Sequence, residues 1–164
     1  MKIMNKFQKK LANRKKDNKG FSLVELIIVI AIMAILVGIV GTQVLPYINK
    51  SKEAKDFQII NSYGTAATTA YSSNAEKVTA NTTIIVYGTN ADATAQTLEA
   101  EIKDLTGYDA IGDLKAKMGS KKGKTIAAVK VVIDITGKKI TTQAYSDASC
   151  AAGKEVFDAV VTQL

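Results

Sequence analysis

Few side chains in this 164-residue chain could do chemistry, and the most distinctive is a single acid, Glu25. It is followed by an apolar stretch with no charged residue until Lys50, in which 26–40 has no polar side chain at all. An ionisable group at the edge of a bilayer-length apolar segment is costly to keep there. We therefore expect Glu25 to have a function.

Residues for catalysis are otherwise scarce. The sequence has no histidine, which excludes His-based triads and His–metal sites. Cys150 has no partner for an intrachain disulfide, so it is either a small buried residue or the site of an intermolecular bridge. Oxygen ligands for calcium could come from Asp104, Asp109 and Asp113, but their spacing fits no EF-hand loop and favours a solvated turn. We expect no enzymatic activity, no cofactor and no metal site.

The basic residues are concentrated at the N-terminus. Residues 1–20 hold eight basic side chains and one acid, whereas 21–164 hold fourteen of each sign. Lys and Arg beside an apolar segment keep that end in the cytoplasm. The excess positive charge therefore predicts membrane topology, and we expect no direct binding of nucleic acid.

The apolar run from Phe21 to Leu45 is 25 residues long, which suits a membrane-spanning helix of about 20 residues. A secretory signal has an apolar core of roughly 7–15 residues and a small-x-small cleavage site. Gly38 and Gly41 would make only a poor site of that kind. The spacing of Ser22 and Glu25 also matches a capping box, which would fit any helix start. The polar residues that interrupt the run are Ser22, Glu25, Thr42 and Gln43.

The segment KKDNKGFSLVELIIVIAIMAILVGIVG, Lys15 to Gly41, resembles the type IV pilin and pseudopilin family. The resemblance covers residues 15–46. It implies that Gly20 is the last leader residue, that Phe21 is the first mature residue and becomes N-methylated, and that Glu25 is the assembly acid. The chain would then be a substrate of prepilin peptidase, which cuts after Gly20, where no Cβ encumbers the extended backbone.

The resemblance implies a structural subunit that polymerises through its apolar helix into a cell-surface pilus, or fimbrium, serving adhesion or motility. Its partners would be copies of itself in a helical filament, the peptidase, the membrane, and an assembly platform with its ATPase. The precursor would span the cytoplasmic membrane once, with its N-terminus in the cytoplasm, before joining an extracellular filament. One alternative is a pseudopilin of a type II secretion or competence DNA-uptake machine. Another is a monomeric signal-anchored surface protein, which would retain residues 1–20.

Beyond the apolar run the helix is expected to continue. Pro46, the only proline, follows Gly38 and Gly41, and it removes a backbone hydrogen bond inside a helix. The stretch from Gly38 to Pro46 is therefore a predicted kink, unless the helix ends at the membrane surface. After it, apolar residues at helical spacing predict one buried stripe, with Lys50, Lys52, Glu53, Lys55 and Asp56 on other faces. The stripe comprises Tyr47, Ala54, Phe57, Ile60, Tyr63, Ala67, Ala70 and Tyr71.

The remaining residues predict a small α+β head. We expect a strand over 82–88, a helix over 91–105, and strands over 124–135 and 138–146 joined by Thr136-Gly137 as a two-residue turn. Pairing Ile135 with Lys138 brings opposite charges and apolar pairs into register and buries Val129, Val131, Ile133 and Ile135 on one face. Residues 150–164 are ambiguous between helix and strand.

The predicted fold is α+β and pilin-like, with a long N-terminal helix packed against a small antiparallel sheet. Its membrane-spanning half is followed by an amphipathic half. The predicted domains are a basic leader (1–20), which is removed, a transmembrane and assembly helix (21–45), its amphipathic continuation (46–74), and an extracytoplasmic head (75–164).

Overall fold

The computed structural model describes residues 20–164, so the predicted leader, apart from Gly20, lies outside the described residues. Helical backbone continues along the sequence through α2 (Leu23–Ile39), a π-helical turn η2 (Val40–Val44) and α3 (Leu45–Ser73). The chain divides into two compact units at Leu45/Pro46, and each is described by itself. The predicted long N-terminal helix and the α+β fold are confirmed.

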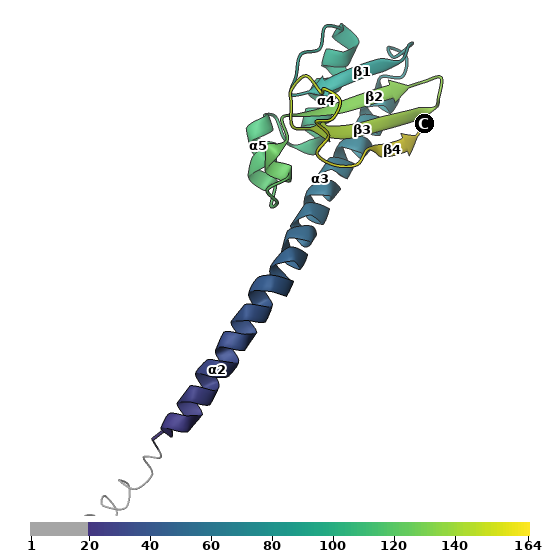
Figure 1. The fold of residues 1–164 in the computed structure, drawn as a ribbon. Helices are drawn as coiled ribbons and strands as arrows, with labels where there is room; N and C mark the ends of the chain where they lie inside the picture. Colours follow the sequence, from purple (N-terminus) through teal and green to yellow (C-terminus); the bar gives the residue numbers. More distant parts are fainter. Residues whose placement is uncertain (1–19) are drawn as a thin grey trace, which may run out of the picture. The chain divides into compact units, whose positions relative to one another are not determined.

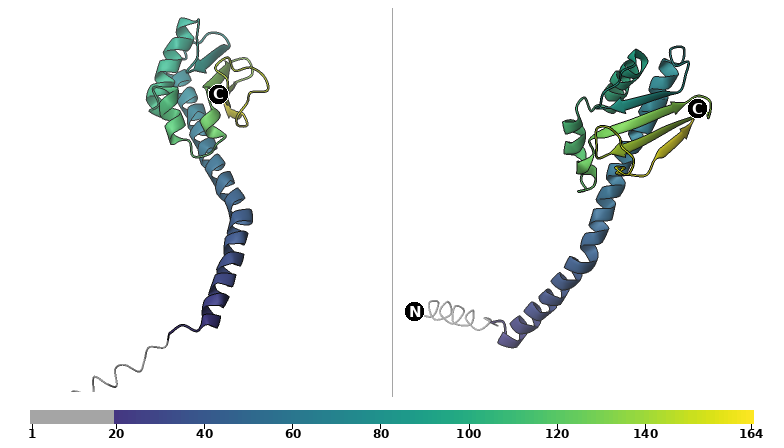
Figure 2. Two further views of the ribbon diagram at one scale, coloured as in Figure 1. Left: turned by 60° about the vertical axis from the view of Figure 1, so that its left-hand side comes forward. Right: turned by 45° about the horizontal axis from the view of Figure 1, so that its top comes forward.

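The second unit is a two-layer α+β head in which α3 lies against a four-stranded antiparallel sheet (Figures 1 and 2). Its strands follow chain order across the sheet. They are β1 (Thr82–Val86), β2 (Ala128–Asp134), β3 (Lys139–Tyr145) and β4 (Val160–Gln163). Residues 150–164, which were ambiguous from sequence, thus contribute an edge strand.

The buried stripe of α3 begins later than the spacing predicts. Ile60, Tyr63, Ala67 and Ala70 are buried in the core, as expected. Tyr47, however, is 73% exposed, because the sheet covers only the later part of α3. Two further corrections are that Ala54 is exposed and that Asp56, predicted on a polar face, is buried. Phe57 and Tyr71 are half-buried against the core.

The β2–β3 hairpin has the predicted register. Asp134 pairs with Lys139, Ile133 with Ile140, and Val129 with Ala144. The side chains of Val129, Val131 and Ile133 are fully buried in the core shared with α3, and Ile135 is partly buried beside them. Because side chains alternate between the faces of a strand, this register decides which residues form the core.

All three predicted strands extend beyond the observed ones, the 138–146 strand by one residue at each end. A 3-10 turn η3 (Gly123–Thr125) occupies the start of the predicted 124–135 strand, so β2 begins at Ala128. β1 ends at Val86, because Tyr87 has a φ of 71° and turns the chain.

Two helices lie between β1 and β2 in the chain. α4 (Ala93–Thr106) is capped by Asp92, which accepts from the Ala95 amide at 3.1 Å, and it ends at Gly107, whose φ is 73°. The short helix α5 (Ile111–Lys117) was not predicted. The fully buried Leu98, Ile102 and Leu114 bring both helices into the core shared with α3.

A tyrosine cluster joins α3 to the segments that flank α4. The hydroxyls of Tyr63 and Tyr87 lie 2.6 Å apart, and the Tyr87 hydroxyl donates to the Tyr108 carbonyl at 2.7 Å. Burial is the main cause that raises the pKa of both Tyr63 and Tyr87 above the usual value for tyrosine. The cluster is therefore neutral at physiological pH and serves as a set of hydrogen bonds inside the core.

The C-terminal segment is fastened without a disulfide. β4 pairs with β3, and the Leu164 amide donates to the Lys138 carbonyl at 2.9 Å. Before β4, Val156 and Phe157 are buried, and the Phe157 ring lies 6.0 Å from that of Phe57 on α3, measured between centroids. Backbone pairing and apolar packing therefore hold the C-terminal segment to the rest of the head.

Candidate functional site

The predicted site lies at the start of α2, where the chain enters the helix. The Ser22 amide donates to Glu25 Oε2 at 2.8 Å, and Ser22 Oγ accepts from the Val24 amide at 3.4 Å and from the backbone of Glu25. The capping box expected from the Ser-x-x-Glu spacing is therefore present. It holds the Glu25 carboxylate beside the first turn, where the positive end of the helix dipole favours an anion.

Gly20 and Phe21 precede this cap and are open to solvent. Phe21 is 85% exposed, and a Cβ added at Gly20 would meet no atom within 4 Å. Both are exposed with respect to the rest of residues 20–164, so within this part of the chain an approaching enzyme can reach them.

The apolar side chains of α2 have no partner within the described residues. All residues of α2 are exposed, and the helical run from Leu23 contains a segment long and apolar enough to cross a membrane. A signal sequence would pass the same test of length and composition. So much exposed aliphatic surface requires lipid or other apolar helices around it.

The stretch predicted to kink contains the π-helical turn. Val40–Val44 is π-helical. Within it, Thr42 Oγ1 donates to the Gly38 carbonyl at 3.0 Å. Pro46 follows the turn and cannot donate the amide hydrogen bond that an α-helix would need there. The expected role of Gly38, Gly41 and Pro46 as a kink remains a prediction.

The other candidate residues do not form a reactive cluster. Asp113 Oδ2 accepts from the Ala110 amide at 3.1 Å and so caps α5. Among residues 20–164 no three Cys, Asp or Glu side chains come together as metal ligands would. Cys150 belongs to the loop after β3 and is buried in a small cluster with Ala128 and Tyr145, and burial raises the pKa of its thiol.

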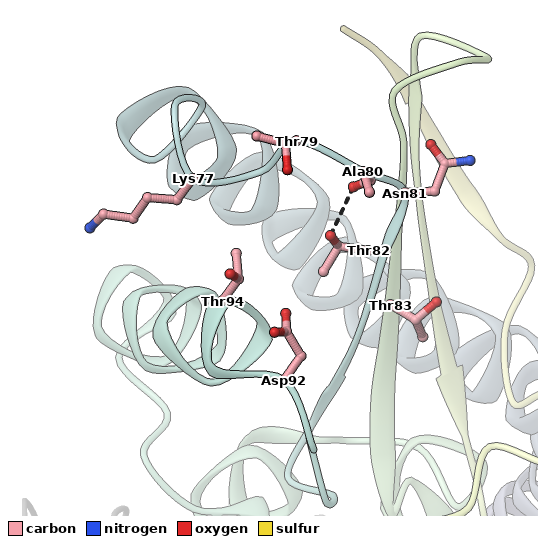
Figure 3. A pocket seen from close by; sticks show the side chains of 8 residues that line it. All are labelled: Lys77, Thr79, Ala80, Asn81, Thr82, Thr83, Asp92 and Thr94. Atoms are coloured by element: carbon pink, nitrogen blue, oxygen red, sulfur yellow. Dashed lines mark hydrogen bonds between the residues drawn. The ribbon is translucent and has the colours of Figure 1, made fainter.

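One hollow on the head, of about 370 Å³, lies between the 77–83 segment and the start of α4 (Figure 3). Asp92 and Thr94 point toward it, whereas the side chains of Lys77 and Asn81 extend away from them. Asn81 Nδ2 instead donates to Asp134 Oδ1 at 3.1 Å, and its Oδ1 accepts from the Ile135 amide at 2.9 Å. Asn81 thereby fixes the β2–β3 turn, and the hollow has no arrangement suited to catalysis.

The sequence did not single out Asp56, although it is the most constrained carboxylate of the head. It is 1% exposed on α3 and accepts from the amides of Gly119 and Ser120, each at 2.8 Å, and from the Ser120 hydroxyl. Its helical spacing is the sequence signal for its burial, because it stands four residues before Ile60 and seven before Tyr63 on the same face of α3.

The comparisons with known proteins concern the N-terminal segment. Residues 15–41 match the family model described as the prokaryotic N-terminal methylation motif, which is the signature of type IV pilins and their prepilin precursors. The resemblance stated from the sequence is thereby confirmed. Neither the curated proteins nor the solved structures gave a match. The motif supports a type IV pilin-like or pseudopilin protein, and it implies processing by prepilin peptidase and association with a membrane.

Proposed function

We propose that this chain is the structural subunit of a type IV pilus. Prepilin peptidase cuts it between Gly20 and Phe21 and methylates the new Phe21 amine, and the mature chain polymerises through residues 21–45. One observation carries the proposal. The methylation motif at 15–41 overlaps an apolar helix that is exposed throughout and whose first turn contains Glu25 in a capping box. The helix is built to be covered, and copies of the same helix supply a matching surface.

Glu25 provides register in this assembly. In one chain the Ser22 amide and the helix dipole stabilise its carboxylate. When other apolar helices remove water, a buried carboxylate needs a cation, and the Phe21 amine of a neighbouring subunit is suited to that role. The pairing fixes the axial position of each subunit, while burial of aliphatic surface supplies most of the attraction.

The proposed topology follows from charge and hydropathy. The basic leader, residues 1–20, stays in the cytoplasm, residues 21–45 span the membrane, and residues 46–74 with the head at 75–164 lie outside. Assembly then draws the subunit out of the membrane, which requires an assembly platform and an ATPase. The π-helical turn between Gly38 and Pro46 is the segment we expect to change conformation in that step.

A pseudopilin of a secretion or DNA-uptake machine is the second candidate, because the methylation motif fits it equally. The two functions share the chemistry of Gly20, Phe21 and Glu25. They differ in the extent of the filament, so electron microscopy of surface filaments distinguishes them.

The test of the proposal separates the charge of Glu25 from its cap. Glu25→Gln keeps a side-chain oxygen to accept from the Ser22 amide but removes the charge. We expect this variant to insert in the membrane and to be cleaved normally, and to enter filaments poorly. The measurement is the amount of subunit in sheared surface filaments relative to the amount in the membrane.

Ser22→Ala is the matched control, because it removes the hydroxyl that caps the helix and leaves the charge of Glu25. We expect it to retain most assembly. Normal filament yield from Glu25→Gln would reduce Glu25 to a helix cap. Equal loss in both variants would assign the effect to the cap and not to the charge.

A further inference from the structure

The head carries a cluster of exposed lysines built from two segments that are far apart in the chain. One segment, on α3, supplies Lys52 and Lys55, and the other, from α5 to η3, is acid-free from residue 114 to residue 133. We call the cluster the basic face. It comprises Lys52, Lys55, Lys117, Lys121, Lys122 and Lys124, which are all exposed.

Asp56 holds the two segments together. It accepts from the amides of Gly119 and Ser120, each at 2.8 Å. A Cβ on Gly119 would lie 3.7 Å from the Cβ of Lys52, and one on Gly123 would collide with the Asp56 carboxylate. The 118–123 loop is thus fixed against the helix turn that carries Lys52 and Lys55.

Within residues 20–164, no lysine of the basic face forms an ion pair. Asp56, which connects the two segments, is buried, and its carboxylate accepts hydrogen bonds from backbone amides and from the Ser120 hydroxyl. The single ion pair of these residues joins Lys103 and Glu99, while Lys122 Nζ lies 5.1 Å from the centroid of the Phe157 ring. Glu53, the acid next to Lys52 on α3, is half-buried. It lies about 100° around the helix from Lys52 and about 60° from Asp56.

The basic face is also tied to the end of the apolar run. Lys52 and Lys55 follow Leu45 by only seven and ten residues in the sequence, and helical segments of these lengths span about 11 Å and about 15 Å. The polar headgroup layer adds about 5–8 Å beyond the hydrocarbon core, and electrostatic attraction extends about one Debye length, roughly 8–10 Å, further. When residues 21–45 span a membrane, these lysines are within reach of its surface charge.

We propose that the basic face binds anionic phospholipid headgroups and holds the head of the membrane-inserted chain against the outer surface of the bilayer. Clustered lysines next to a membrane segment are attracted to anionic lipid over a Debye length, and the contact is weakened by salt. The interaction keeps the head of each unassembled subunit in one orientation relative to the bilayer. It rests on insertion of residues 21–45 in a membrane and not on filament assembly.

The experiment uses the full chain reconstituted in vesicles of phosphatidylcholine, with or without phosphatidylglycerol. A membrane-impermeant amine reagent labels exposed lysines, and mass spectrometry gives the labelling rate of each. We expect phosphatidylglycerol to slow labelling of the basic face several-fold at low salt and to have little effect at high salt. Lys138, Lys139 and Lys154, which lie elsewhere on the head, are internal controls and should keep their rates.

A matched pair of variants tests the cause. Lys117, Lys121 and Lys124 are changed to Gln in one, and Lys138, Lys139 and Lys154 in the other, so that both lose three charges. Only the first should lose the protection of Lys52 and Lys55 by phosphatidylglycerol. If a variant misfolds, the labelling of the unsubstituted chain in neutral and anionic vesicles still tests the proposal, because it needs no substitution.

Four outcomes would overturn the proposal. Equal labelling rates in neutral and anionic vesicles would show that the basic face is solvated. Protection in neutral vesicles by inorganic phosphate would assign it to a free anion, and protection by duplex DNA without any effect of phosphatidylglycerol would assign it to nucleic acid. Protection that depends on protein density alone would point to contact between copies of the chain.

Discussion

At the scale of single residues, Asp56 shows how one buried carboxylate can position a whole loop. Its oxygens accept from two successive backbone amides and one hydroxyl, and Ser120 Oγ in turn accepts from the Gly123 amide at 2.8 Å. A carboxylate removed from water is tolerated only with such a full set of donors. The sequence could not predict these hydrogen bonds, because the partners are backbone groups more than 60 residues away.

Asp56→Ala should therefore destabilise the head by roughly 2–4 kcal/mol, since it leaves the buried Ser120 amide, the Ser120 hydroxyl and the partly buried Gly119 amide without their acceptor. Glu53→Ala, one turn earlier on the same helix, is the control and should cost about 0.5 kcal/mol or less. The measurement is urea unfolding in detergent followed by tyrosine fluorescence, because all six tyrosines lie after residue 45. Equal costs for the two variants would mean that the loop is not held by Asp56.

At the scale of elements, the β2–β3 hairpin and α3 form the centre of the head. The hairpin register was predictable because Thr136-Gly137 forms a two-residue turn and Val129, Val131, Ile133 and Ile135 stand at every second position of the first strand. α5 was not predictable in the same way, because its seven residues are too few to show a helical period. The start of β2 was misplaced because the local 3-10 turn at Gly123–Thr125, held by the Asp56 loop, overrides the β-propensity of that segment.

Ile133→Ala should cost about 2–5 kcal/mol, because the side chain is fully buried between β2 and α3 and its removal leaves a cavity. Val132→Ala, on the opposite face of the same strand, should cost about 1 kcal/mol or less. Thermal melting of the two variants in detergent gives the comparison. A larger loss from Val132→Ala would mean that the strand is turned the other way.

At the scale of the whole molecule, charge separates the precursor from the mature chain. The precursor carries a formal charge of +7, all of which comes from residues 1–20. Residues 21–164 have equal numbers of acidic and basic side chains, so the proposed cleavage after Gly20 would leave a chain without the net charge that opposes close packing of copies in the proposed filament. The N-terminal site could be read from sequence because its motif is local, whereas the assembly that it serves depends on other chains.

The measurement that tests this account most directly is the intact mass of the protein extracted from its native membrane. We expect a chain that begins at Phe21 and carries about 14 Da of added methyl mass. Gly20→Leu should leave uncut precursor, because a bulky side chain then stands at the cleaved bond. An N-terminus at Met1, or one near residues 42–45, would contradict the account, because the chain would then be a signal-anchored or conventionally secreted protein.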